Sequence, residues 1–243
     1  MSTTPVELID FAEAPGLFME PAPKHLQHAD ERFVLTAEIG RTWTAVERIR
    51  LEGADVEAAV ARIDAFMFEA RTVRASWWLS ERSTPGDVEE RLLSAGCKRD
   101  DSDYLHAAMV LTREPPAVDG IEARRLETAD EHLEALAVQQ AVFGAETTSE
   151  PEYGAWIDGR IAAVGRTIWT PVGGYLIGGA TAEWARGRGA YRAVVRARWD
   201  EAVRRGTPAL AVGAGPMSRP ILERLGFEQV LQLRRVESVR SDT

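Results

Sequence analysis

Strand-like and helical hydrophobic patterns follow one another along the first half of the chain. Residues 32–40 (RFVLTAEIG) form a short run rich in apolar and β-branched side chains that ends at Gly40, which is typical of a strand. Residues 55–71 instead place apolar side chains three or four positions apart behind Asp55, a candidate N-cap. The pattern predicts strands at residues 32–40, 42–51, 75–80 and 104–111 and helices at residues 55–71 and 84–97.

The second half repeats this alternation of strands and helices. Thr128 and Glu131 have the spacing of a capping box at a helix start. Asp158 and Gly159 separate two apolar runs and predict a tight hairpin turn. We expect strands at residues 120–126, 173–184, 208–214 and 228–237 and a hairpin at residues 152–170. Helices are expected at residues 128–144 and 218–227, and a turn followed by a helix at residues 181–206.

A seam between the halves lies in residues 111–120 (LTREPPAVDG). Pro115 and Pro116 cannot both sit inside a helix or a central strand, and Gly120 completes a linker pattern. Each half also contains a helix followed by a similar run, ERLLSAGC or ERLGFEQ, which fits an internal duplication. We therefore predict an α/β or α+β protein with two domains, residues 1–114 and 119–243.

Composition removes several classes of protein. The chain of 243 residues has 45% hydrophobic residues and a formal charge of −9, which argues against general nucleic-acid binding. No apolar run has the roughly 18 residues of a membrane span, and the first residues do not form a secretory signal. The single cysteine excludes an internal disulfide. We expect a cytoplasmic protein, with a composition typical of a GC-rich bacterial genome.

Basic residues gather in one stretch of this acidic chain, residues 181–206 (TAEWARGRGAYRAVVRARWDEAVRRG). It holds seven arginines and three acids, a local charge of +4. The two glycines Gly187 and Gly189 precede a helix, whose start leaves N–H groups unpaired and carries a partial positive charge. This arrangement predicts a phosphate or pyrophosphate site. A Walker ending and the third glycine of a dinucleotide fingerprint are both missing, which disfavours nucleotide sites of those kinds.

Two segments resemble motifs of the GCN5-related N-acetyltransferase (GNAT) superfamily. ATAEWARGRGAYRAVV is similar to its motif A, with Arg186 and Gly189 in the pyrophosphate-loop pattern, and GPMSRPILERLGFEQV is similar to motif B. The resemblance spans roughly residues 119–237. It implies acetyl-coenzyme A as donor, acyl transfer to an amine, and two tandem GNAT-like domains, each with a mixed, mostly antiparallel sheet flanked by helices. It also implies two sets of cofactor contacts: backbone pairing with the pantetheine arm at Gly179, Ala180 and Thr181, and pyrophosphate binding at Gly187, Arg188, Gly189, Ala190, Tyr191 and Arg192.

The catalytic residues are less well marked than the cofactor site. Glu183 follows the strand that should carry the thioester and is a candidate base; a solvated carboxylate is the alternative. Many family members have a tyrosine acid where Leu222 stands and an asparagine where Gly215 stands. A non-catalytic acyl-coenzyme A-binding or sensor module therefore remains open, as does another phosphate-dependent transferase. The expected acceptor is an amine of a small molecule or peptide, the excess negative charge favours a cationic one, and a homodimer stays open.

Other conspicuous residues receive structural interpretations. Trp184 is expected to plug the end of the sheet, and Tyr191 to lie in the core or beside the cofactor. His132 is expected to be exposed and Cys97 to be a small buried apolar residue; no spacing indicates a metal site. The first half should be a degenerate copy, because its counterpart of the basic loop, residues 50–59, has one glycine and several acids. Four arginines are expected on the solvated helix surface, Arg196, Arg198, Arg204 and Arg205.

Overall fold

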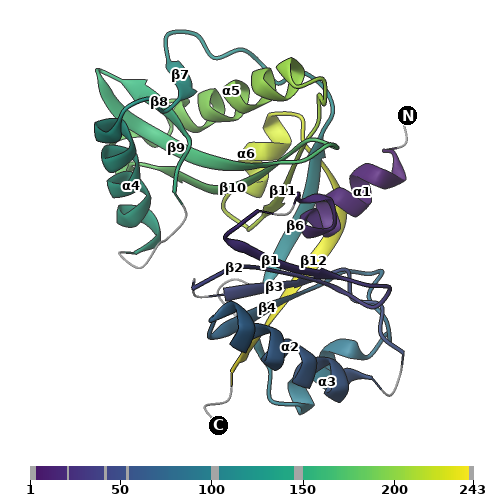
Figure 1. Ribbon diagram of the computed structural model, residues 1–243. Coiled ribbons are helices and arrows are strands. Elements are labelled where there is room, and N and C mark those ends of the chain that lie inside the picture. The colour runs from purple at the N-terminus through teal and green to yellow at the C-terminus, as the bar shows by residue number, and fades with distance from the viewer. Residues whose placement is uncertain are drawn as a thin grey trace. The chain divides into compact units, whose positions relative to one another are not determined.

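The computed structural model describes residues 4–20, 22–40, 43–52, 55–99, 104–144 and 150–240. Contacts divide the chain into two compact units. The first contains Met1–Met109, Gly213–Arg219 and Gln229–Thr243, and the second contains Val110–Val212 and Pro220–Glu228. Parallel and antiparallel strands form a mixed sheet flanked by helices, so the predicted α/β class is confirmed (Figure 1). The units are not two continuous segments, and the domain limits 1–114 and 119–243 stay a prediction.

The first unit is built on strands paired in the order β1-β2-β3-β4-β12-β6. Strands β3 and β4 run parallel, whereas β1–β2, β2–β3 and β4–β12 are antiparallel. The elements of this unit are α1 (Val6–Glu13), the 3-10 helix η1 (Pro15–Phe18), β1 (His25–Ala29), β2 (Val34–Glu38), β3 (Trp43–Glu47), α2 (Val56–Ala70), β4 (Arg74–Leu79), α3 (Val88–Ser94), β5 (Lys98–Arg99), β6 (Leu105–Leu111) and β12 (Glu228–Val239).

The core of the first unit follows the predicted hydrophobic pattern. Helix α2 buries Val56, Ile63 and Met67 against the sheet, while Val60 is only partly buried. Asp55 occupies the N-cap position of α2, but its side chain makes no capping hydrogen bond, so that part of the prediction is wrong. Cys97 is 5% exposed, which confirms that it is buried, and burial raises the pKa of its thiol to about 11.

The second unit pairs its strands in the order β11-β10-β9-β8-β7, with β10 and β11 parallel and the others antiparallel. Ala163 packs in a cluster with residues of α5, whereas Val164 packs with residues of α4, so the two helices cover opposite faces. The elements are β7 (Glu122–Arg125), α4 (Ala129–Phe143), β8 (Tyr153–Ile157), β9 (Arg160–Trp169), β10 (Gly174–Thr181), η2 (Glu183–Ala185), α5 (Ala190–Arg204), β11 (Leu210–Ala214) and α6 (Arg219–Arg224).

Local signals in the second half are confirmed by the structure. Thr128 accepts from the Glu131 N–H, and the Glu131 carboxylate accepts from the Thr128 N–H, which completes the capping box. Asp158 and Gly159 both have positive φ values, 52° and 75°, and join β8 to β9. Helix α1 and strand β1 lie outside the predicted elements.

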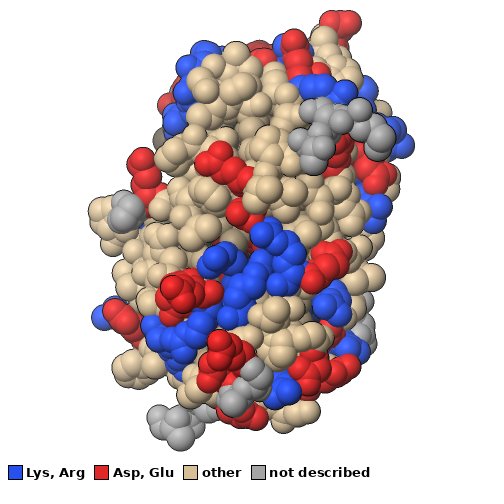
Figure 2. Space-filling view, turned by 90° about the vertical axis from the view of Figure 1, so that its right-hand side faces the viewer, with Lys and Arg blue, Asp and Glu red and all other residues tan. Residues whose placement is uncertain are grey.

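Charged side chains of both signs are interspersed on the surface. In the space-filling view, arginine and lysine side chains lie beside aspartate and glutamate rather than forming an uninterrupted basic face (Figure 2). Within the described residues, none of the helices combines the length and the apolar character needed to cross a lipid bilayer.

Candidate functional site

The start of α5 forms a concave group of backbone N–H donors. Gly187 and Gly189 have φ values of +76° and +94°, which favour glycine, and Gly189 is the left-handed N-cap of α5. No side chain caps the helix. In the described part of the chain, Ala193 is the first residue of this turn whose N–H donates to a backbone carbonyl, that of Gly189, at 3.1 Å. The N–H groups of Gly189, Ala190, Tyr191 and Arg192 thus remain available to an anion.

Several arginines surround this nest of N–H groups. Arg186 and Arg192 are exposed, and neither has an ion pair among the described residues. Arg188 is held by Asp158, with 3.2 Å between Nη2 and Oδ2. Arg188 and Arg160 both stack on Trp184, with their guanidinium carbons 5.8 Å and 4.6 Å from the ring centroid. Arg192 thus lies next to the nest, with its Nη2 3.2 Å from the place of a Cβ on Gly189, and Arg186 lies in the loop before the nest, while Arg188 and Arg160 are occupied by neighbours.

The strand that leads into the nest has one unpaired edge. Strand β10 pairs with β11 only from Gly174 to Leu176, although β10 continues to Thr181. On its other edge it pairs with β9, with a register shift between Ile177 and Ala180. Gly178, inside this bulge, has a φ of +60°. Residues beyond Leu176 therefore offer backbone groups to a ligand that lies along the strand as an added strand would.

Helix α4 fixes the bulge from one face of the sheet. Gln139 is fully buried, and its Nε2 donates to the Gly178 carbonyl at 2.9 Å. Its Oε1 has no partner among the described residues. Sequence reasoning missed Gln139, although a glutamine at an apolar position of α4, four residues after the buried Ala135, is a detectable signal.

Helix α5 approaches the bulge from the opposite face. The Tyr191 ring lies against Gly179, and Arg198, two turns later, is 1% exposed beneath Gly165. Burial raises the pKa of Tyr191, and the positive charge of Arg198 opposes that rise. The prediction that Arg198 is solvated is wrong; its spacing of seven residues from Tyr191 places it on the buried face of α5.

Glu183 lies at the rim of a separate cavity of about 450 Å³ in the second unit. Its lining combines apolar side chains of α4 with acids, arginines and an indole ring. Trp184, 39% exposed, also lines this cavity, and its place at the end of the sheet stays a prediction. The cavity is lined by Glu134, Ala137, Val138, Ala141, Val142, Arg160, Ile161, Ala182, Glu183, Trp184 and Arg186.

The two positions where the family pattern places an acid and an asparagine offer no reactive side chain. Leu222 on α6 is fully buried. Gly215 has no side chain, and its carbonyl accepts from the N–H groups of Ser218 and Arg219 at 3.1 Å and 3.0 Å. Neither position supplies a proton donor.

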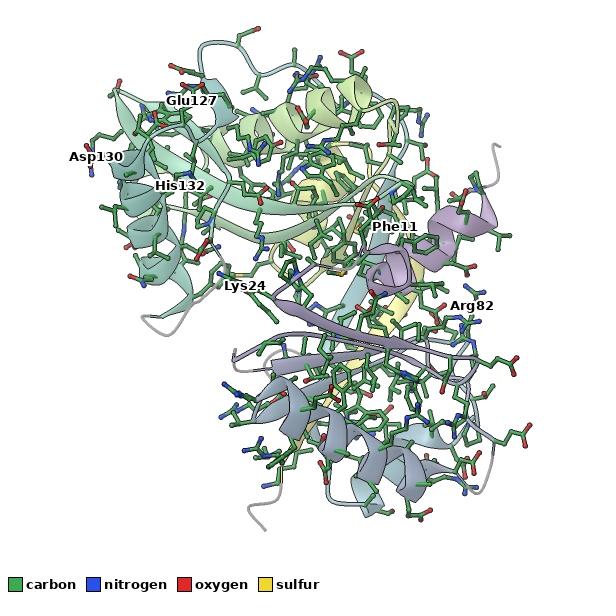
Figure 3. All side chains as sticks on the ribbon, in the orientation of Figure 1. Phe11, Lys24, Arg82, Glu127, Asp130 and His132 are labelled. Atoms are coloured by element: carbon green, nitrogen blue, oxygen red, sulfur yellow. The ribbon has the colours of Figure 1, made fainter. Side chains whose placement is uncertain are left out.

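The structure brings most of the predicted cofactor residues together. The nest residues 187–192, Arg186 and the β10 segment 179–181 are consecutive parts of one strand–loop–helix unit. Glu183 belongs to the same loop but opens into the cavity beside α4. His132 is exposed near the start of α4, beside Glu127 and Asp130 (Figure 3), which confirms its predicted exposure. Within the described residues, no group of three or more histidine, cysteine or acidic side chains is arranged to hold a metal ion.

In the first unit, the segment that corresponds to the unpaired part of β10 is hydrogen-bonded to its own neighbours. After parallel strands β3 and β4, the Leu51 N–H donates to the Thr84 carbonyl at 2.9 Å, and the Thr84 N–H donates to the Ile49 carbonyl at 3.1 Å. Arg50 and Thr84 form a further parallel bridge. Gly53, the single glycine of the corresponding loop, lies outside the described residues. The backbone of this segment is therefore already occupied by the protein.

Comparison with known proteins finds likeness in structure rather than in sequence. No family model and no curated protein matches the chain. A GCN5-related N-acetyltransferase from Kribbella flavida has a TM-score of 0.67 at 15% identity, over 97% of this chain and 96% of that one. One from Sphaerobacter thermophilus has a TM-score of 0.60 at 16% identity, over 89% and 83%. A tandem GNAT protein from the clavulanic acid biosynthesis pathway has a TM-score of 0.57 at 14% identity, over 100% and 90%.

These likenesses show the fold. The chain has the fold of the GNAT superfamily, which confirms the resemblance of its two motifs at that level. At identities of 14–16%, shared fold does not carry activity, acceptor or site residues from one protein to another.

Proposed function

We propose that this protein is an acetyl-coenzyme A-dependent N-acetyltransferase that acts on an amine of a small molecule or peptide. The observation that carries the proposal is one continuous unit, in which the unpaired edge of β10 leads into the N–H nest at the start of α5. A diphosphate fits the nest, with Arg186 and Arg192 as counter-charges, and an extended arm fits the edge of β10.

The residues that would hold the cofactor are those of the strand–loop–helix unit. Acetyl-coenzyme A supplies an acyl thioester, which is an activated acyl group. Gly179, Ala180 and Thr181 offer backbone groups to its arm, and residues 187–192 hold the diphosphate. Glu183 is the candidate that accepts a proton from the acceptor ammonium, since only the neutral amine is a nucleophile. The cavity that Glu183 lines is the proposed place for an acceptor. The net charge of −9 of the whole chain favours a cationic one.

A non-catalytic acyl-coenzyme A-binding module is the second candidate. It is favoured by one observation, the buried Leu222 and side-chain-free Gly215 where the family pattern places catalytic residues. Release of free thiol from acetyl-coenzyme A in the presence of a panel of amines separates the candidates. Sustained release supports the enzyme; cofactor binding without release by any amine supports the module.

We further propose that residues 1–114 and 119–243 are tandem GNAT-like copies and that the first is degenerate. The closed backbone at Leu51 and Thr84 supports this, because a pantetheine arm would have no free strand edge there. We also propose a cytoplasmic location, which a single buried thiol suits. The oligomeric state, including a homodimer, stays open.

Ligand binding is expected to stabilise the protein selectively. Coenzyme A and acetyl-coenzyme A at about 100 times their Kd should each add roughly 2.7 kcal/mol to the free energy of unfolding, whereas ATP and NAD should add little. Thermal-shift measurements with the four ligands side by side provide the test. The absence of a shift with saturating coenzyme A would overturn the proposed function.

Gly189→Glu is expected to abolish this stabilisation, because a carboxylate at the helix start competes with the diphosphate for the nest. Gly206→Glu is the matched control: Gly206 also has positive φ, +76°, and lies at the other end of α5. It adds the same charge and a similar backbone strain away from the nest. If Gly189→Glu folds and retains coenzyme A affinity, the assignment of the nest is wrong.

Isothermal titration calorimetry should give one coenzyme A site per chain. Among the described residues at the corresponding place, the backbone of Ile49 and Leu51 is already hydrogen-bonded to Thr84, and Arg50 is bound to Glu13 at 2.8 Å. A stoichiometry of two per chain would contradict the proposed degeneracy of the first half while leaving the second site intact.

A further inference from the structure

Tyr191 reaches from the nest to the unpaired segment of β10. Its backbone belongs to the first turn of α5, and its ring lies against Gly179 in the bulge. A Cβ added to Gly179 would lie 2.8 Å from Tyr191 Cε2 and 3.5 Å from the hydroxyl oxygen. The absence of a side chain at Gly179 therefore permits this contact. A ligand that binds both the nest and the strand edge must pass the Tyr191 ring.

Beneath this ring lies a buried cation with no acid partner. Arg198 is 1% exposed; backbone carbonyls accept hydrogen bonds from it, and the Tyr191 hydroxyl is the side-chain group that interacts with its charge most directly. Its Nε donates to the Val194 carbonyl at 3.2 Å, and its Nη1 donates to the Arg166 carbonyl at 3.3 Å. Nη2 has no hydrogen-bond partner in the described part of the chain. Gly165 makes room for the guanidinium, since a Cβ there would lie 2.8 Å from Nη1.

The proximity of Arg198 decides what the Tyr191 hydroxyl can do. A guanidinium only donates hydrogen bonds, so the hydroxyl oxygen beside it can act only as an acceptor toward Arg198. The O–H proton is then directed elsewhere, and no acceptor for it occurs among the described residues. Because burial raises the pKa of Tyr191, the hydroxyl keeps its proton at neutral pH. The result is an oriented donor beside Gly179.

We propose that the Tyr191 hydroxyl donates a hydrogen bond to an amide carbonyl of the pantetheine arm of coenzyme A, and that Arg198 is the positioning residue that orients it. The inference rests on the proposed function and deepens it. The arm carries two amide groups, and an arm paired with β10 runs past the Tyr191 ring. Tyr191, which stands where the family pattern has a small residue, thus becomes a contact that selects ligands bearing the arm.

Tyr191→Phe tests this contact by removing one oxygen atom. Coenzyme A should bind about three- to tenfold more weakly to the variant, as expected for loss of one hydrogen bond. The affinity for 3′-phosphoadenosine 5′-diphosphate, which has the diphosphate but no arm, should be unchanged. Tyr153→Phe is the matched control, because Tyr153 is a second buried phenol that interacts with Arg198 but lies on β8. It should bind both ligands as the unmodified protein does.

The positioning role of Arg198 is tested by Arg198→Met, which keeps similar volume without the charge. The single variant should weaken coenzyme A binding by a similar factor. In the double variant with Tyr191→Phe, it should cause little further loss of affinity, since both changes remove the same interaction. Loss of the cation should also raise the pKa of Tyr191, seen as a shift of tyrosinate absorbance to higher pH. If Arg198 had only a structural role, Arg198→Met would weaken the binding of both ligands, and its effect on affinity would add to that of Tyr191→Phe. Circular dichroism checks the fold of each variant.

The outcomes separate this inference from the proposed function. If the unmodified protein binds no coenzyme A, the proposed function and this inference both fall. If coenzyme A binds equally to the unmodified protein and to Tyr191→Phe, the inference is overturned and the function stands. Equal weakening of coenzyme A and the arm-free diphosphate would place the effect of Tyr191 on the nest, which also overturns it.

Discussion

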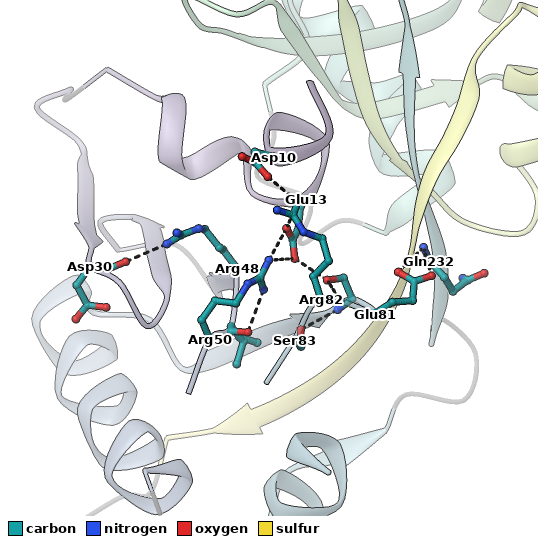
Figure 4. Close-up of polar contacts among 11 residues, drawn as sticks. Asp10, Glu13, Asp30, Arg48, Arg50, Glu81, Arg82, Ser83 and Gln232 are labelled. Atoms are coloured by element: carbon teal, nitrogen blue, oxygen red, sulfur yellow. Dashed lines mark hydrogen bonds and ion pairs between the residues drawn. The ribbon is translucent and has the colours of Figure 1, made fainter. Parts of the chain in front are cut away.

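Glu13→Ala is expected to lower the free energy of unfolding of the first unit by about 3–5 kcal/mol, because it removes one member of a buried ion pair. Glu13 at the end of α1 is 3% exposed. Both of its carboxylate oxygens accept from Arg50 Nη2, at 2.9 Å and 2.8 Å (Figure 4). Ser80 Oγ donates to Oε1. Arg82 Nη1 donates to Oε2 at 3.1 Å.

The size of this effect follows from what the substitution leaves behind. Arg50 has 21% side-chain exposure, so its charge would stay largely desolvated without a carboxylate. Ser80 is 1% exposed and would lose the acceptor of its hydroxyl. Unpaired buried groups cost more than the net gain from forming a pair. For a unit of this size, the loss corresponds to a decrease in Tm of roughly 10 °C or more, measured by scanning calorimetry.

Asp10→Ala is the matched control on the same helix. Asp10 also pairs with Arg82, at 2.6 Å, but its side chain is 31% exposed. Because exposed ion pairs contribute about 0–1 kcal/mol, this variant should unfold near the unmodified protein. Equal effects of Glu13→Ala and Asp10→Ala would show that burial does not govern the strength of this network.

The local chemistry of the candidate site could be predicted because it depends on neighbours in sequence. Gly187 and Gly189 before a helix predict the nest, and Asp158 with Gly159 predicts the hairpin, because glycine and positive φ are local properties. The capping box of Thr128 and Glu131 is local in the same way. These signals held without knowledge of the tertiary fold.

Residues that act through long-range packing could not be found in that way. Arg198 on α5 was predicted to be solvated because arginine is usually exposed, yet Gly165 on β9 provides the space in which it is buried. Gln139 holds the bulge through Gly178, 39 positions later in the chain. The N-terminal segment was missed because part of what fixes it is polar, and Glu13 and Gly16 find their partners on distant strands and turns. Partners of this kind become visible only when the chain is folded.

Gly16 contacts a second buried acid, which gives the first unit an unusual pH dependence. Glu47 on β3 is 7% exposed, and its Oε2 accepts from the Gly16 N–H at 3.0 Å. Burial raises its pKa to about 8; the hydrogen bond from Gly16 opposes this rise, and the negative charge of Glu13 adds to it. Glu47 is therefore largely protonated in the folded protein at neutral pH, whereas in the unfolded chain it ionises near its ordinary value of 4.5.

Glu47→Gln is expected to stabilise the first unit at pH 8 by a few kcal/mol and to change it little at pH 5. With a folded pKa above the unfolded one, the contribution of Glu47 is fully present below pH 4.5 and is lost as pH rises toward about 8. Glutamine stays neutral, and its carbonyl can accept from Gly16, so the variant avoids this loss. The difference in Tm between the variant and the unmodified protein, measured by calorimetry from pH 5 to pH 8, tests this. Glu57→Gln, which removes an exposed charge on α2, is the control. Parallel pH profiles for Glu47→Gln and the unmodified protein would show that Glu47 is ionised in the folded state and that its burial does not control stability.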